Sequence, residues 1–154
     1  MTKRNFRIRE ATVSDIELLV EFQLNTALET EGVRLEKNTV NKGVKGVFHD
    51  PSKGQYYIAE KSGQPIGCLL VVPEWSDWRN GTILWIHSTY VIPGERRQGV
   101  LRKFYEHLQS LVNKSPYLLG LRTLVDKGNL RGLEAARALG MKSEHYETYE
   151  WLKE

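Results

Sequence analysis

The sequence predicts one α/β domain over residues 1–154, in which a mixed, mostly antiparallel sheet is flanked by helices. The first observation is the order of the expected elements, β-α-α-β-β-β-α-β-α-β. The second is that short turns join the middle strands, which makes those strands antiparallel. The third is the helix expected over residues 99–114. It stands between two strands, so these should be parallel with a right-handed crossover.

Composition and charge narrow the classes of function. Hydrophobic residues make up 40% of the chain and charged residues 27%, as in ordinary soluble proteins. The net charge of +3 is too mild for a nucleic-acid binder. No signal-peptide core and no run near the roughly 20 apolar residues of a membrane span are found, so a cytoplasmic location without a membrane partner is expected. Cys68 is the only cysteine, which excludes an internal disulfide and a cysteine metal cluster, and no metal site is expected.

Three elements are expected before the middle strands. Residues 5–9 alternate as a first strand. Ser14 and Glu17, three residues apart, have the pattern of a capping box that opens an amphipathic helix. A loop over residues 29–35 and a second helix over about 36–48 follow.

The rest of the chain alternates strands, turns and helices. Strands are expected at residues 56–60, 66–72, 82–92, 117–125 and 146–152. Asn80–Gly81 is a strong hairpin signal. The last helix, over residues 129–139, should end at Gly140, since glycine favours the left-handed conformation that follows helices.

A basic turn stands between the strand over 82–92 and the helix over 99–114. It reads Arg96-Arg97-Gln98-Gly99-Val100-Leu101, with Pro93 before it. A helix N-terminus has unpaired N–H groups and partial positive charge, so it suits an anion such as a pyrophosphate. Gly99 would let the backbone come close to that ligand. The alternative is a solvated basic turn.

With this turn inside that order of elements, nearly the whole chain resembles the GNAT family of N-acetyltransferases. The family signature is Gln/Arg-x-x-Gly-x-Gly/Ala, and Leu101 stands where the last small residue is usual. A later family signature is matched in part: Asn129 is present, but Ala136 replaces a tyrosine that protonates the departing thiolate in many members. The resemblance implies the GNAT fold and transfer of an acetyl group from acetyl-CoA to a primary amine.

The resemblance also implies where acetyl-CoA binds. The N–H groups that would receive the pyrophosphate belong to Gln98, Gly99, Val100 and Leu101. Charge-assisted contacts would come from Arg96, Arg97, Arg102 or Lys103. Asn129 is assigned to the same site. The backbone of Tyr90 and Val91 would pair with the pantetheine amides, and the N–H of Val91 would polarise the thioester carbonyl.

Acetyl transfer needs a base, because an alkylammonium with a pKa near 10.4 is not a nucleophile. Strict alternation places four side chains on one face of the strand: Trp85, His87, Thr89 and Val91. Tyr90 would then lie on the other face. His87 is the ionisable residue of its face, and a pKa near 6.5 suits a base. The alternative is a histidine that only orients a substrate or a water.

The acid that protonates the departing thiolate is not identified. Ala136 cannot donate a proton. Tyr105, Tyr146, Tyr149 and a water are the candidates, and a thiol with a pKa near 8.5 also leaves without help.

Two loops, residues 25–32 and 73–81, are expected to border the acceptor cleft. Their acidic residues would hold a cation: Glu29, Glu31, Glu74 and Asp77. Trp75 and Trp78 would enclose it by cation–π contacts. This favours a small cationic amine over a peptide amine. The alternative is that the acidic residues are solvated and the tryptophans pack at a core edge or a subunit interface, which allows a homodimer.

Two alternative functions are compatible with part of these observations. One is a catalytically weak or inactive regulatory module that binds acetyl-CoA, favoured by Ala136 and by the lack of a partner for His87 in the sequence pattern. The other is a nucleic-acid-binding domain that uses the basic turn. The mild charge and the acidic loops argue against it.

Overall fold

A computed structural model describes residues 5–154, which divide into two compact units. The first unit ends at Leu124 and contains the sheet. The second runs from Val125 to Glu154 and contains helix α4 (Leu130–Ala138). The single domain expected from the sequence stays a prediction.

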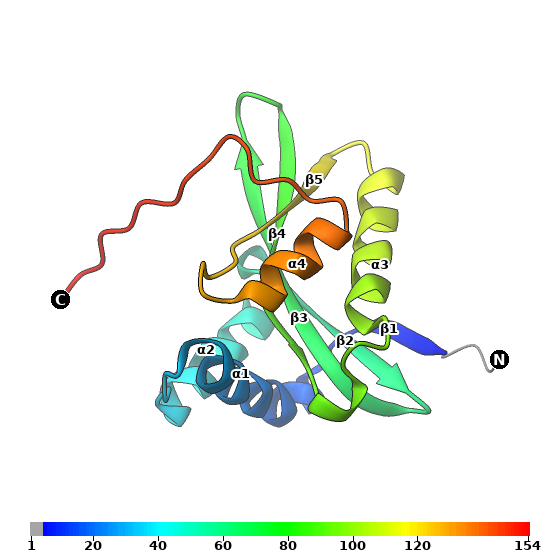
Figure 1. The fold of residues 1–154 in the computed structure, drawn as a ribbon, viewed down its shortest axis with the longest axis vertical. Helices are drawn as coiled ribbons and strands as arrows, with labels where there is room; N and C mark the ends of the chain where they lie inside the picture. The colour runs from blue at the N-terminus through cyan, green and yellow to red at the C-terminus, as the bar shows by residue number, and fades with distance from the viewer. Residues whose placement is uncertain (1–4) are drawn as a thin grey trace. The chain divides into compact units, whose positions relative to one another are not determined.

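The sheet has five strands in the order β1-β2-β3-β4-β5 (Figure 1). Their bounds are β1 (Phe6–Glu10), β2 (Gln55–Lys61), β3 (Gln64–Ser76), β4 (Gly81–Val91) and β5 (Leu118–Thr123). The first four are antiparallel neighbours, while β5 is parallel to β4. The mixed sheet and the parallel pair around the crossover helix confirm the predicted fold class.

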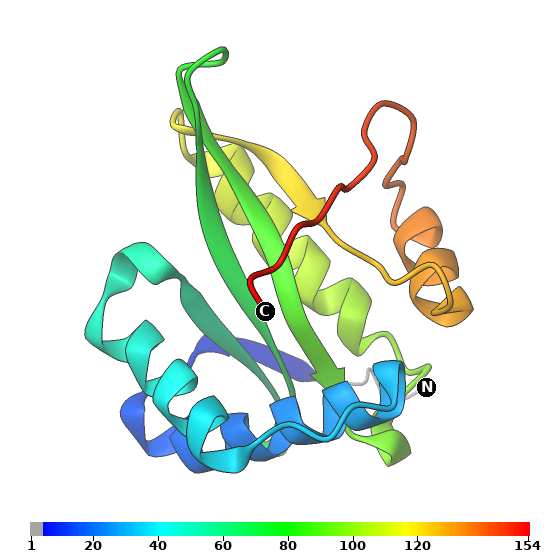
Figure 2. The ribbon, with the colours of Figure 1, turned by 90° about the vertical axis from the view of Figure 1, so that its left-hand side faces the viewer.

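Helices cover both faces of the sheet (Figures 1 and 2). α1 (Ile16–Glu31) and α2 (Lys37–His49) lie on one face, and α3 (Val100–Lys114) lies on the other. None of the helices in the described range is long and apolar enough to cross a membrane.

Each face of the sheet has its own apolar core. On the α3 side, Phe104 and Leu108 are fully buried against strand residues such as Leu69. On the α1 side, Leu19 packs with Ile58, and both are fully buried. Phe104 and Leu108 are one helical turn apart, as on the apolar face of an amphipathic helix.

The first helix is longer than expected. α1 continues through most of residues 25–32, where a loop was predicted, and ends at Gly32 in the left-handed conformation (φ 66°). The N–H of Gly32 bonds the carbonyl of Leu28 at 3.1 Å and closes the last turn. Glu29 and Glu31 therefore lie on a helix, and the loop prediction was wrong for them. Glycine at C′ was the signal that could have marked this end.

The predicted capping box of Ser14 and Glu17 is also wrong. The chain enters α1 through a short 3₁₀ turn, Val13–Asp15, and Asp15 makes the reciprocal contact. Its carboxylate accepts the backbone N–H of Thr12 at 2.8 Å. The box is thus Thr12–Asp15, two residues earlier in the chain, and the carboxylate of Asp15 is also bound by Arg9.

The β3–β4 hairpin is longer than predicted. Residues 73–76, expected in a loop, belong to β3, and only residues 77–80 form the turn before Gly81. Pro73 is tolerated because β2 pairs with β3 only as far as Val71, so its missing N–H faces an edge without a strand partner. The Asn80–Gly81 hairpin signal is confirmed, with Asn80 at φ 48°.

The last predicted strand does not form. Residues 146–152 are not part of any strand in the described chain, and Tyr149 and Trp151 are 89% and 88% exposed. Alternation alone cannot make a strand, because a strand needs a neighbour for its backbone groups. The helix before it is confirmed, and Gly140 follows it with φ 83°.

A partly buried ion-pair network ties β1 to the start of α1 and to β2. The guanidinium of Arg9 donates to both carboxylate oxygens of Asp15 at 2.8 and 2.9 Å and to Glu60 at 2.7 Å. Asp15 is only 7% exposed. The hydrogen bond from Arg9 holds the pKa of Asp15 below its usual value.

We expect Asp15→Asn to lower the free energy of unfolding at neutral pH by about 1–3 kcal/mol, because a charge-assisted bond is weakened. The pKa of Asp15 is lower in the folded state, so its contribution is present above the unfolded value of about 3.9 and is lost as the pH falls through the folded pKa. Chemical denaturation at several pH values checks this.

The difference between wild type and variant should shrink in acid. Glu21→Gln, which removes an exposed carboxylate from α1, is the control and should stay within about 0.5 kcal/mol of wild type. A difference for Asp15→Asn that does not change with pH would contradict the assignment.

Candidate active site at the end of β4

A β-bulge at Ser88 interrupts β4. Ser88 has φ 53°, and the register of β3 against β4 passes from Leu70–His87 to Cys68–Tyr90, so β4 has one extra residue. The alternation of side chains therefore reverses there. Tyr90 lies with the α1-side core and Val91 with the α3-side core.

The bulge corrects the predicted faces of this strand. Ile86 belongs to the α3-side core, so His87 faces the α1 side. His87 and Tyr90 thus share a face, while Val91 lies on the other, opposite to the strict alternation expected. The sequence does not predict this bulge, because the residue at its positive φ is a serine, a type that rarely adopts this conformation.

Beyond Ile86 the paired strands β4 and β5 part. Their pairing covers Thr82 to Ile86 on β4, so the rest of that edge has no strand neighbour among the described residues. The N–H of Ile92 bonds Ile66 of β3 at 2.9 Å. Since backbone direction alternates, the N–H and C=O of Val91 point to the open edge and those of Tyr90 point to β3. Val91 therefore presents its N–H to the open edge, whereas its carbonyl accepts Nε of Arg96 at 2.8 Å.

The basic turn leads into an uncapped helix. Arg97 and Gly99 have left-handed backbone (φ 60° and 91°), and α3 begins at Val100. Gly99 supplies no capping side chain, and the first turn of α3 contains no acidic residue. The N–H groups of the first turn are therefore left for another acceptor. A Cβ on Gly99 would meet no heavy atom within 4 Å, so the space above the turn is open.

The arginines of the turn differ in their contacts. Arg96 is half-buried, and its Nε donates to the carbonyl of Val91 at 2.8 Å. Its guanidinium lies 5.5 Å from the centre of the Tyr90 ring and bonds Glu29 at 2.5 Å. Arg97 and Arg102 are exposed at the start of α3.

His87 lies against an anchored tryptophan. Its ring stacks on Trp85 with 6.2 Å between centroids and 20° between planes. The indole of Trp85 donates to Glu74 at 2.5 Å, and Arg122 donates to the same oxygen at 3.4 Å. Burial lowers the pKa of His87, so the imidazole is neutral at pH 7 and able to accept a proton.

The predicted acceptor residues are not brought together. Glu29 and Glu31 lie at the end of α1, whereas the other four lie on the β3–β4 hairpin: Glu74, Trp75, Asp77 and Trp78. Both views place the hairpin tip and α1 at opposite ends of the first unit (Figures 1 and 2). Glu74 and Glu29 already pair with arginines.

The two tryptophans of the hairpin are open to solvent. Trp75 and Trp78 are 63% and 87% exposed. The cation–π enclosure of an acceptor by these two rings stays a prediction.

Asn129 has a local role in the second unit. Its side chain caps α4 by accepting the N–H of Gly132 at 3.0 Å. Ala136 lies in the same helix, and the exposed Tyr149 follows it. Of the tyrosines considered as acids, Tyr105 lies in the first unit, on α3.

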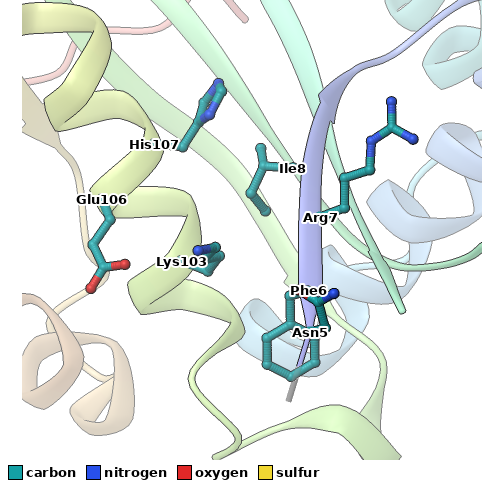
Figure 3. A pocket seen from close by; sticks show the side chains of 7 residues that line it. All are labelled: Asn5, Phe6, Arg7, Ile8, Lys103, Glu106 and His107. Carbon is teal, nitrogen blue, oxygen red and sulfur yellow. The ribbon is translucent and has the colours of Figure 1, made fainter. Parts of the chain in front are cut away.

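A shallow pocket of roughly 530 Å³ lies between β1 and α3 (Figure 3). His107 and Lys103 of α3 face Ile8 of β1 there. Lys103 therefore belongs to this pocket, and none of the other predicted site residues lines it. Within residues 5–154, no three or more His, Cys, Asp or Glu side chains converge as a metal site.

Comparison with known proteins identifies the family. Residues 17–141 match the sequence profile of the Acetyltransferase (GNAT) family. This chain belongs to the GNAT family. Members of this family use acetyl-CoA, as the resemblance implied. None of the curated proteins matches the chain.

Solved structures support the same assignment. A possible acetyltransferase from Clostridium difficile 630 is 33% identical, with a TM-score of 0.90 and coverage of 96% of this chain and 97% of its own. A predicted acetyltransferase with acetyl-CoA from Clostridium acetobutylicum is 18% identical, with a TM-score of 0.73 and coverage of 97% and 95%. An aminoglycoside N-acetyltransferase in complex with CoA is 13% identical, with a TM-score of 0.75 and the same coverage. The last two share the fold.

The bulge generates a prediction about stability. Ser88→Val should lower the free energy of unfolding by about 1–3 kcal/mol, because a β-branched residue is strained at positive φ. Ser88→Gly should be tolerated, because glycine adopts this conformation without strain. Thr89→Val, with the same side chain one residue on, is the control. Equal stability of the two Ser88 variants in chemical denaturation would contradict the bulge.

Proposed function

We propose that the protein is an acetyl-CoA-dependent N-acetyltransferase that acts on the primary amine of a small cationic molecule by direct attack on the thioester. The observation that carries this proposal is the uncapped start of α3 beside the open edge of β4. The helix offers unpaired N–H groups and positive charge, and the edge offers the N–H of Val91. An anionic donor with an amide-bearing arm fits both.

Each part of the donor has a group to receive it. The N–H groups from Gln98 to Leu101 bind the pyrophosphate, and the exposed Arg97 and Arg102 neutralise its charge. The N–H of Val91 donates to the thioester carbonyl, where negative charge develops during attack. Leu101 in place of a small residue leaves these backbone donors intact. Asn129, assigned to the donor from the resemblance, stays a prediction.

His87 is the proposed base. The amine nitrogen forms a bond to the acetyl carbon, the carbon–sulfur bond breaks, and the proton lost by the amine passes to the neutral imidazole, directly or through a water. Stacking on Trp85, which Glu74 fixes, holds the ring in place. The departing thiolate takes its proton from Tyr105 or from water.

The finer identity of the acceptor is also a proposal. Structural neighbours include aminoglycoside acetyltransferases, one of them in complex with sisomicin. A small amine rather than a peptide amine is supported by the acidic residues Glu29 and Glu31 at the end of α1, near the turn. A cytoplasmic location and a homodimer built on the exposed tryptophans remain predictions.

A regulatory module that binds acetyl-CoA without turnover is the second candidate, because Ala136 cannot donate a proton. Release of free thiol from acetyl-CoA separates the two. Incubation with polyamines, aminoglycosides, amino acids and peptides should give thiol with at least one small amine. Binding of acetyl-CoA without turnover on any of them would favour the module, and absence of binding would exclude both.

Gly99→Asp tests the binding of the donor. The variant places a carboxylate where the pyrophosphate lies, and we expect CoA affinity to fall by about tenfold or more. Gly99→Asn is the matched control, because asparagine has nearly the same shape as aspartate and a similar tolerance of left-handed backbone, without the charge. Calorimetric titration should show a much smaller loss of CoA affinity for the asparagine variant. Equal affinities of Gly99→Asp and wild type would remove the central claim.

His87→Gln tests the base. Because burial keeps the pKa of His87 below about 6.5, the rate of the wild type should rise with pH through that pKa and then level. The variant should lack this acidic limb and lose roughly 10²–10⁴-fold in kcat/KM. His107→Gln is the control, since His107 also has a pKa lowered by burial but lies in the pocket between β1 and α3. A wild-type pH profile in the His87 variant would exclude the role.

A further inference from the structure

Arg96 joins the donor turn to the end of α1. Its Nε bonds the carbonyl of Val91 at 2.8 Å, and its terminal nitrogen bonds Glu29 at 2.5 Å. The residues of the ion pair are 67 positions apart in the sequence, so the contact is purely tertiary. One guanidinium therefore touches the strand end assigned to the donor and the helix end assigned to the acceptor.

We propose that Glu29 and the donor's pyrophosphate compete for Arg96, an inference that rests on the proposed function. Binding of the donor draws Arg96 to the pyrophosphate and releases Glu29, which then binds the ammonium group of the acceptor. The ion pair is thus an exchangeable contact that makes the acceptor site complete only after the donor has bound.

The exposure of the pair makes the exchange easy. The side chains of Arg96 and Glu29 are 37% and 38% exposed. Exposed ion pairs are weak, because water and salt screen both charges. The buried pair of Arg9 and Asp15 is different, with side chains only 24% and 9% exposed. Arg96 can therefore change partners where Arg9 cannot.

The turn favours the pyrophosphate over a single carboxylate. Arg97 and Arg102 are exposed beside Arg96, and the first turn of α3 has no acidic residue. A pyrophosphate brings more negative charge than Glu29 and also accepts the unpaired N–H groups of the helix. Phosphate oxygens match the planar guanidinium as well as a carboxylate does.

The carboxylate of Glu29, once released from Arg96, would lie where the local charge is negative and favours a cation. Glu29 stands three residues before Gly32, in the last turn of α1, where the helix end carries partial negative charge. No basic residue occupies that turn, and Glu31 adds a further negative charge. An ammonium group of the acceptor supplies the missing positive charge, which assigns the acceptor to the cationic amines.

The first test measures CoA binding by calorimetry. Glu29→Gln removes the competitor, and CoA affinity should rise by about two- to fivefold, the size expected from an exposed ion pair. Glu31→Gln removes the same charge from the same helix turn without touching Arg96 and should leave CoA affinity within about 1.5-fold. Unchanged or reduced CoA affinity of Glu29→Gln would overturn the competition. If Glu29 only held Arg96 in place for the donor, its loss would weaken CoA binding.

A double-mutant cycle shows whether Glu29 acts through Arg96. In the Arg96→Gln background, Glu29→Gln should no longer raise CoA affinity. The same gain in both backgrounds would mean that Glu29 acts only by its general field and would overturn the exchange. A wild type that fails to bind CoA at all refutes the proposed function itself, which is a separate outcome.

The acceptor half is tested with the best amine from the thiol-release screen. At saturating acetyl-CoA, Glu29→Gln should raise the KM for that amine by about fivefold or more and change kcat by less than about twofold. An unchanged KM would overturn the role of Glu29 toward the acceptor. A screen that finds no amine favours the regulatory module and counts against the acceptor role of Glu29, and the calorimetry still decides the competition for Arg96.

Discussion

The extra residue at Ser88 sets the geometry on which the site at the end of β4 depends. Before it, Leu84 and Ile86 pack towards α3, and after it Val91 does so. The reversal turns the ring of Tyr90 to the α1 side, where it packs on Phe22 with 4.9 Å between centroids. It also turns the backbone of Val91 away from β3. Without the bulge, this backbone would be used within the sheet.

The helix that follows is built differently from its neighbours. α2 is capped by Glu36, whose carboxylate accepts the N–H groups of Asn38 and Thr39. α4 is capped by Asn129. α3 begins at Val100, after Gly99, which has no side chain to cap the helix and whose left-handed backbone (φ 91°) favours glycine. The first N–H groups of α3 therefore have no capping side chain, and a bound anion would accept them instead.

Local patterns predicted most of the elements and the basic turn before α3, because periodicity and turn chemistry act over a few residues. α2 and the Asn80–Gly81 hairpin were found in this way. The predictions failed where the cause was distant in sequence. Pro73 remains in a strand because β2 has ended beside it, and residues 146–152 alternate without a strand neighbour in the described chain.

The site shows the same limit. Arg96 was predicted as a phosphate ligand from its place in the turn, but its bond to Glu29 was not visible, since nothing near Arg96 in the sequence points to α1. The bulge at Ser88 was not predicted for a related reason. The positive φ of this serine is imposed by the pairing of β3 with β4, which lies outside the local sequence pattern. Local sequence thus named the candidate groups, and tertiary pairing decided which way they face.

Two arginines show how burial separates structural from exchangeable ion pairs. Arg9 is enclosed by Asp15 and Glu60 at the junction of β1, α1 and β2, and breaking that network would leave a buried carboxylate without its partner. Arg96 makes as short a bond to Glu29, yet water reaches both side chains. Distance alone would rank the two pairs equally. Exposure distinguishes them by the free energy needed to separate the two charges. Of these two pairs, Arg96–Glu29 beside the basic turn is the easier to separate.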